Sequence, residues 1–122
     1  MTKVLIIDDS SLTREFHSHI VKAAGFACVT AADGMEGLEK ATAEKFHIIL
    51  TDVNMQGMDG YEFTRRLRQN PDYDEVPIII VSTEAKELDK QKGFSAGANL
   101  YLVKPTDASR IVESMRLLLG SR

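Results

Sequence analysis

The sequence predicts an α/β domain in which helices cover both faces of a parallel sheet. Five short apolar runs, rich in branched residues and too short for helices, are expected to be strands: 4–7, 27–29, 47–50, 77–81 and 100–103. The runs at 4, 47 and 77 do not alternate with polar residues, which is typical of strands buried on both faces. Helical patterns lie between the runs, so a strand–helix unit is repeated five times. Right-handed crossovers then give a three-layer, doubly wound sandwich.

The first helical pattern follows Ser10-Ser11, residues of a type that caps helix N-termini. Gly25 is expected to end this helix. Its predicted apolar stripe consists of Leu12, Phe16, Ile20 and Val21.

Two further helices open on an aspartate that is followed three residues later by a glutamate, which is a capping-box pattern. Asp33 stands in this relation to Glu36, and Asp59 to Glu62. We therefore expect Asp59-Gly60 to be structural, turning the chain and capping the next helix.

The last two helices differ in their predicted stability. The one near 86–96 has few apolar residues and an internal Gly93, and glycine costs about 1 kcal/mol relative to alanine in a helix interior. We expect this helix to be loosely held. The final helix carries an apolar stripe from Ile111 to Leu119, and Thr106 is a candidate for its cap.

Length and composition indicate one domain, 1–122, because 122 residues of which 43% are hydrophobic suffice for a single core. The net charge of -3 argues against nucleic-acid binding, which needs excess positive charge. Cys28 is the only cysteine, so a reducing compartment is expected. There is no signal-peptide pattern and no apolar run long enough to span a membrane, so we expect a cytoplasmic monomer.

Polar side chains follow four of the predicted strands. Asp8 and Asp9 come after the first strand, Asp52 after the third, Ser82 at the end of the fourth, and Lys104 after the fifth. Because ligands of such sheets bind beyond the carboxyl ends of the strands, these side chains are expected to form one site.

This set of side chains suits phosphoryl chemistry. Two like charges about 4 Å apart repel by roughly 4 kcal/mol at an effective dielectric near 20, so clustered carboxylates need a cation. All-oxygen ligands favour Mg²⁺. Asp52 beside Mg²⁺ and Lys104 is a candidate nucleophile toward phosphorus, with Ser82 bonding a phosphoryl oxygen.

The chain resembles the receiver domain of bacterial response regulators, and most closely the single-domain chemotaxis type. The resemblance covers nearly all of the chain and lies in four segments: IIDDS (6–10), LTDVNMQGMDG (50–60), VSTEA (81–85) and YLVKP (101–105). It implies a flavodoxin-like fold with the parallel strand order 2-1-3-4-5. It also implies that the chain catalyses no reaction beyond its own phosphorylation and dephosphorylation.

The resemblance implies a role for each matching residue at the phosphorylation site. Asp52 matches the phosphoacceptor, and Lys104 matches the lysine that contacts the phosphoryl group. Asp8 and Asp9 match the acidic pair at Mg²⁺, with Asp9 and Asp52 as direct ligands. Asn54 matches the residue whose backbone carbonyl completes the protein ligands.

The resemblance also implies switch and timing residues. Ser82 matches the switch hydroxyl, and Tyr101 matches the aromatic residue that changes rotamer with it. Asn54 and Glu84 match positions that help to set the lifetime of the phosphoryl group. The Lys104-Pro105 bond is expected to be cis, as in the family.

Two residues depart from the family pattern. Gln56 stands where proline commonly follows the methionine, so the loop is expected to be less rigid. Thr106 stands where phenylalanine is common after Lys-Pro. Neither departure touches the phosphoryl chemistry directly.

The resemblance implies two kinds of partner. A histidine kinase, or a small donor such as acetyl phosphate, would supply the phosphoryl group. A downstream protein would read the surface of the fourth helix, fifth strand and fifth helix, where Lys86, Lys90, Phe94 and Tyr101 are candidate contacts.

Three other interpretations stay open. An aspartyl-nucleophile phosphatase would need a second acid two residues after the first, where Asn54 follows Asp52. A flavodoxin-like cofactor binder would need a phosphate loop that Asp8 and Asp9 would repel. The chain is also consistent with a receiver excised from a longer regulator.

The residues outside these motifs are expected to be structural. We expect His17, His19 and His47 to be surface or rim residues that bind no metal. Cys28 is expected to be a small buried residue of the second strand.

Overall fold

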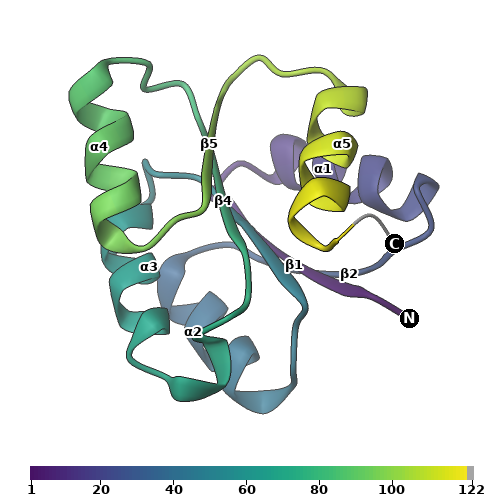
Figure 1. Ribbon diagram of the computed structural model, residues 1–122, viewed down its shortest axis with the longest axis horizontal. Helices are drawn as coiled ribbons and strands as arrows, with labels where there is room; N and C mark the ends of the chain where they lie inside the picture. The colour runs from purple at the N-terminus through teal and green to yellow at the C-terminus, as the bar shows by residue number, and fades with distance from the viewer. Residues whose placement is uncertain (121–122) are drawn as a thin grey trace.

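Strands and helices alternate along the computed structural model, which describes residues 1–120 (Figure 1). Ser121 and Arg122, the last residues of the expected domain, lie outside the described residues. The elements are β1 (Lys3–Ile7), α1 (Ser11–Ala23), β2 (Ala27–Ala31), α2 (Gly34–Ala43), β3 (Ile48–Thr51), α3 (Gly60–Arg68), a 3-10 turn (Pro71–Tyr73), β4 (Ile78–Ser82), α4 (Glu87–Ala96), β5 (Leu100–Val103) and α5 (Ala108–Leu118). The predicted order is confirmed, with strand ends shifted by at most two residues.

All strand pairs in the sheet are parallel, and the strand order β2-β1-β3-β4-β5 confirms the predicted fold. At the carboxyl edge of the sheet, Ile7 lies opposite both Ala31 and Thr51. This register brings the ends of β1 and β3 level with each other, so the residues that follow them emerge side by side.

Each face of the sheet carries its own hydrophobic core. In β1, Leu5 and Ile7 point into one core and Val4 and Ile6 into the other, because successive side chains of a strand point to opposite faces. Helices α2, α3 and α4 cover the first face, while α1 and α5 cover the second (Figure 1).

Helix α1 buries a different stripe from the predicted one. Leu12 and Phe16 are 77% and 53% exposed, and the buried residues are His17, Ile20 and Val21. The prediction of a surface position for His17 was therefore wrong. Residues 17, 20 and 21 share one helical face, but so do residues 12, 16 and 20, and only packing decides which of the two faces is buried.

The remaining histidines and the cysteine lie near their expected places. His19 is exposed, and His47 is exposed with its Nδ1 accepting a hydrogen bond from the Lys3 backbone N–H. Cys28 is half-buried and not fully buried, because β2 lies at the edge of the sheet.

Most predicted caps are present. The side chains of Ser10, Asp33 and Asp59 accept hydrogen bonds at the starts of α1, α2 and α3. The cap of α5 was predicted wrongly, because Asp107 occupies that position and accepts from the Arg110 N–H at 2.9 Å. The Thr106 hydroxyl is instead buried without a partner among the described residues.

Helix α4 has a packing reason for its glycine. A Cβ at Gly93 would lie 3.0 Å from both the Ile80 Cδ1 and the Tyr101 Cδ2. The helix thus lies directly on side chains of β4 and β5. Its outer residues include Leu88 and Phe94, which are 61% and 49% exposed.

Within residues 1–120, no helix is long and apolar enough to cross a bilayer.

Candidate functional site

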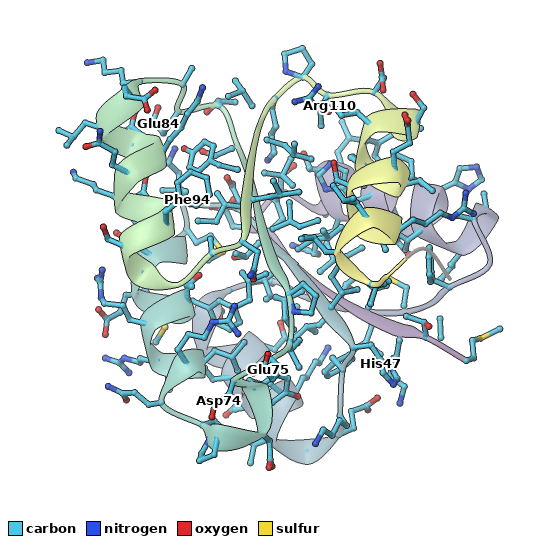
Figure 2. All side chains as sticks on the ribbon, viewed as in Figure 1. His47, Asp74, Glu75, Glu84, Phe94 and Arg110 are labelled. Carbon is cyan, nitrogen blue, oxygen red and sulfur yellow. The ribbon has the colours of Figure 1, made fainter. Side chains whose placement is uncertain are left out.

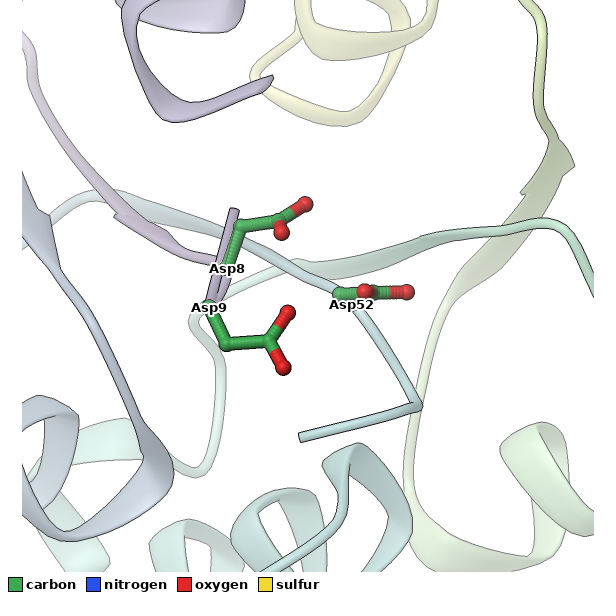
Figure 3. Close-up of side chains that lie close together, drawn as sticks. All are labelled: Asp8, Asp9 and Asp52. Atoms are coloured by element: carbon green, nitrogen blue, oxygen red, sulfur yellow. The ribbon is translucent and has the colours of Figure 1, made fainter. Parts of the chain in front are cut away.

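Three carboxylates meet at the carboxyl edge of the sheet (Figure 3). Backbone hydrogen bonds extend the ladder by one residue past the strands, with Asp8 N–H donating to Ala31 and Asp52 N–H donating to Ile7. Asp8 and Asp52 are 2% and 8% exposed, while Asp9 is open to solvent. One oxygen from each carboxylate lies within 4.8 Å of the others, which is a spacing that could hold a metal ion.

Lys104, which directly follows the edge strand β5, completes this cluster. The Lys104 Nζ lies 2.9 Å from the Asp8 Oδ2 and 3.6 Å from the Asp52 Oδ2. The Lys104 N–H donates to the Ser82 carbonyl oxygen at 2.7 Å, which ties the lysine backbone to β4. The Lys104-Pro105 peptide bond is cis, as the resemblance implied.

The electrostatic environment disfavours a charged Asp52. Burial raises the pKa of the Asp52 carboxyl above its ordinary value, and the negative charges of Asp8 and Asp9 act in the same direction. The Lys104 ammonium and the Val53 N–H, which donates to the Asp52 Oδ1 at 2.8 Å, lower this pKa without cancelling the rise. A further cation beside the three acids would relieve the remaining repulsion.

The loop after β3 is held by two buried methionines. Met55 and Met58 are 9% and 8% exposed, with Asn54, Gln56 and Gly57 open to solvent between and beside them. Gly57 has a φ of 81°, a value that favours glycine. The expected loss of rigidity at Gln56 stays a prediction.

Ser82 and Tyr101 both bond to one residue of the loop after β4. The Ser82 Oγ is fully buried and accepts a hydrogen bond from the Glu84 N–H at 3.1 Å. The Tyr101 hydroxyl donates to the Glu84 carbonyl oxygen at 2.7 Å, and the residue is 8% exposed. The predicted switch pair therefore shares a backbone partner, while the Glu84 side chain is exposed.

Two residues near the site were not predicted. His17 lies with Asp8, Thr51 and Asp52 around a small hollow that is also lined by residues of β1, β3 and β4. The Arg14 Nη1 donates to the Asp8 carbonyl oxygen at 2.6 Å, and so supports the turn that carries Asp8 and Asp9. The helical face of His17 was visible in the sequence, but no pattern indicated the contact of Arg14.

Comparison with known proteins assigns the chain to a described family. Residues 4–116 match the family described as the response regulator receiver domain. Protein PilH of Pseudomonas aeruginosa is 32% identical over 98% of this chain and 99% of its own length. The structure of Vibrio cholerae chemotaxis protein CheY4 superposes with a TM-score of 0.93 at 39% identity, covering 97% of this chain and 98% of that one.

Some relatives are longer or were solved with a metal. The receiver domain of sensor histidine kinase PA1611 from P. aeruginosa, with magnesium in its active-site cleft, has a TM-score of 0.91 at 26% identity and covers 98% of each chain. The chain spans 13% of the gliding motility regulatory protein of Myxococcus xanthus, which is 41% identical over 84% of this chain. It spans about half of Streptomyces coelicolor CseB, at 49% of that protein's length.

Proposed function

The chain belongs to the response regulator receiver domain family and is a phosphoryl-accepting switch of two-component signalling, and we propose that Asp52 is the residue that accepts the phosphoryl group. The observation that carries this proposal is the Lys104 Nζ lying within 3.6 Å of both Asp8 and Asp52 at the edge where three carboxylates meet. No second function has an observation of this kind in its favour.

In the reaction we propose, an oxygen of the Asp52 carboxylate attacks the phosphorus of a phosphohistidine or of acetyl phosphate. The bond from phosphorus to the donor breaks as the bond to Asp52 forms. Lys104 lies where it would stabilise negative charge on the transferred group. The Val53 N–H holds one carboxylate oxygen in place.

Receiver domains bind Mg²⁺ at an acidic pocket, and the donor set here fits that ion. Asp8, Asp9 and Asp52 offer oxygen ligands within 4.8 Å of one another, and the two neighbouring acids raise the pKa of Asp52. We propose that these three side chains, with the Asn54 backbone carbonyl, hold Mg²⁺. The bound ion would neutralise charge on the phosphoryl oxygens.

The signal would leave the site through Ser82 and Tyr101. A phosphoryl group on Asp52 would attract the Ser82 hydroxyl, whose oxygen now accepts from the Glu84 N–H. Because Tyr101 bonds the same residue, this change would bias the position of Tyr101 and of the loop.

Receiver domains act with histidine kinases and downstream proteins, and we propose α4, β5 and α5 as the surface read here. Its candidate contacts are Lys86, Lys90, Phe94 and Tyr101, and Figure 2 labels Phe94, which is a residue of α4.

The central test uses beryllofluoride, a phosphoryl mimic, in the presence of Mg²⁺. We expect wild-type protein to bind it, to be labelled by acetyl phosphate at Asp52, and to capture its downstream partner more strongly when it is bound. The Asp52→Asn variant should show none of these effects. Failure of both reagents to modify the wild type would contradict the assignment.

The exposed Asn54 and Glu84 predict a short-lived phosphoryl state, because the resemblance assigns these positions to control of the attacking water. We expect a half-life of seconds to minutes in purified protein, measured by loss of label after the donor is removed. A half-life of hours would contradict this prediction.

The alternative of an excised receiver uses the same site. The relatives include proteins of this length, such as PilH, and longer regulators, such as CseB. The same residues would accept the phosphoryl group in either arrangement.

A further inference from the structure

Tyr61 comes directly after Gly60, whose backbone contacts the segment that carries Asp52. It is the second residue of α3, and Gly60 before it donates its N–H to the Val53 carbonyl oxygen at 2.8 Å. A Cβ at Gly60 would collide with the Asp52 carbonyl oxygen. The start of α3 therefore lies against the Asp52-Val53 backbone, and a shift of one must move the other.

The Tyr61 side chain reaches from α3 to α4. Tyr61 is 9% exposed, and its hydroxyl donates to the Asp89 carbonyl oxygen at 3.1 Å. Asp89 lies in the first turn of α4, where its own carboxylate accepts from the Lys86 N–H at 3.2 Å. One hydroxyl thus joins α3 to the turn that begins α4.

Tyr101 holds the other end of the same segment. Its hydroxyl donates to the Glu84 carbonyl oxygen, so one tyrosine binds the loop between β4 and α4 and the other binds the first turn of α4. Burial raises the pKa of Tyr61, and the neighbouring Tyr101 hydroxyl acts in the same direction.

The inner face of α4 has few side chains of its own, so its contacts with the two tyrosines matter more for its stability. Gly93 contributes no side chain there, and a Cβ at that position would lie 3.0 Å from the Tyr101 ring. The buried residues of α4 are only Gly93 and Ala96. With so little apolar surface of its own, the helix depends on contacts made by residues of other elements.

We propose that Tyr61 is a positioning residue of the switch, which couples the Asp52 backbone to α4 through its hydrogen bond to Asp89. It forms a second connection to α4, beside the one through Ser82 and Tyr101. This inference rests on the proposed function, because it assigns the route by which a change at Asp52 reaches the surface read by a partner.

The test compares Tyr61→Phe with Tyr73→Phe by amide hydrogen exchange. Tyr73 is a matched control, because its buried hydroxyl donates to the Ala41 carbonyl oxygen at 2.7 Å and not to α4. Without ligand, Tyr61→Phe should speed exchange of the α4 amides about fivefold relative to α2, the factor expected for one hydrogen bond. Tyr73→Phe should not speed α4 relative to α2.

The coupling itself is tested by adding beryllofluoride with Mg²⁺. In wild type this should change exchange across residues 84–93, and Tyr61→Phe should reduce the change at least twofold while ¹⁹F NMR still reports beryllofluoride bound. An unchanged α4 response in a Tyr61→Phe protein that binds beryllofluoride would overturn the inference. So would unchanged α4 exchange without ligand.

The two proposals fail in different ways. Wild-type protein that does not bind beryllofluoride would overturn the assignment of Asp52. The ligand-free comparison of Tyr61→Phe with Tyr73→Phe would still decide whether Tyr61 holds α4.

Discussion

At the scale of single residues, Asp52 is held in an environment that stabilises its protonated form. Burial and two neighbouring acids outweigh Lys104, so the pKa of Asp52 is raised in the folded protein. As the pH rises, Asp52 ionises in the unfolded chain near pH 3.8 but in the folded protein only at a higher pH. Between these two pKa values the free energy of unfolding falls, and the loss is complete above the pKa of the folded state. The site thus lowers stability at neutral pH, which is common for functional clusters.

Because folding raises the pKa of Asp52, we expect Asp52→Asn to stabilise the Mg²⁺-free protein at pH 7, on the order of 1 kcal/mol. The gain should shrink as the pH is lowered toward 3.8. Urea unfolding at several pH values measures it, and Glu113→Gln is the control because Glu113 is exposed on α5. A destabilised Asp52→Asn protein at pH 7 would show that the contact with Lys104 outweighs the repulsion.

His17 has the opposite linkage. Burial and the charge of Lys104 hold the pKa of His17 below 6.5, although Asp8 partly opposes them. As the pH falls, His17 therefore binds a proton in the unfolded chain before it does so in the folded protein. The free energy of unfolding decreases as the pH falls below 6.5 toward the pKa of the folded state.

The wild type should lose free energy of unfolding as the pH falls from 7.5 to 5.5. We expect this loss to be smaller in His17→Leu, by about 1 kcal/mol at pH 5.5. Leucine suits the face that His17 shares with Ile20 and Val21. The exposed His19→Gln is the control and should keep the wild-type pH dependence, measured by urea unfolding. Equal pH dependence in wild type and His17→Leu would contradict the linkage.

At the scale of elements, the turn from β3 into α3 is set by backbone contact. Gly60 lies against the Asp52 carbonyl oxygen, whereas Gly57 has open space around its Cβ position and only its φ of 81° to favour glycine. The two glycines of one loop are therefore required for different reasons.

Gly60→Ala should destabilise the protein by about 3 kcal/mol or more, because rigid backbone atoms must move to admit the methyl group. Gly57→Ala should cost only about 1–2 kcal/mol, the penalty for a left-handed conformation. Thermal and urea unfolding of both variants measure this difference. Equal losses would mean that the loop can yield at Gly60.

The elements also show how far sequence reasoning extends. Strand runs and caps such as Ser10 and Asp59 were predictable, because they depend on residues close together in the chain. The stripe of α1 was not, since Leu12 and Phe16 are as apolar as buried residues and only packing decides that His17 lies inside. Thr106 and Asp107 are both able to cap α5, and one residue of offset decided between them.

At the scale of the whole molecule, ligand binding and stability should be linked. If Asp8, Asp9 and Asp52 hold Mg²⁺ in the folded state alone, the ion stabilises the fold by about 1.4 kcal/mol at ten times its dissociation constant. We expect Mg²⁺ to raise the melting temperature of wild type and of Glu113→Gln. Asp9→Asn should lose most of this rise.

This comparison is made at constant ionic strength, because salt alone screens the acidic cluster. The measurement is thermal unfolding with Mg²⁺ replaced by an equivalent of NaCl. An equal rise in wild type and Asp9→Asn would place the ion elsewhere.

The amino-acid sequence was enough to predict the order of strands and helices, the polar residues at the carboxyl ends of the strands, and the motifs of a receiver domain. These depend on local periodicity and on residue type. Only tertiary packing brings Lys104 within 3.6 Å of both Asp8 and Asp52, buries His17 beside the same two acids, and lets Tyr61 reach Asp89. The partners in these contacts are far apart in the chain, and periodicity states which face of an element is buried but not what that face touches.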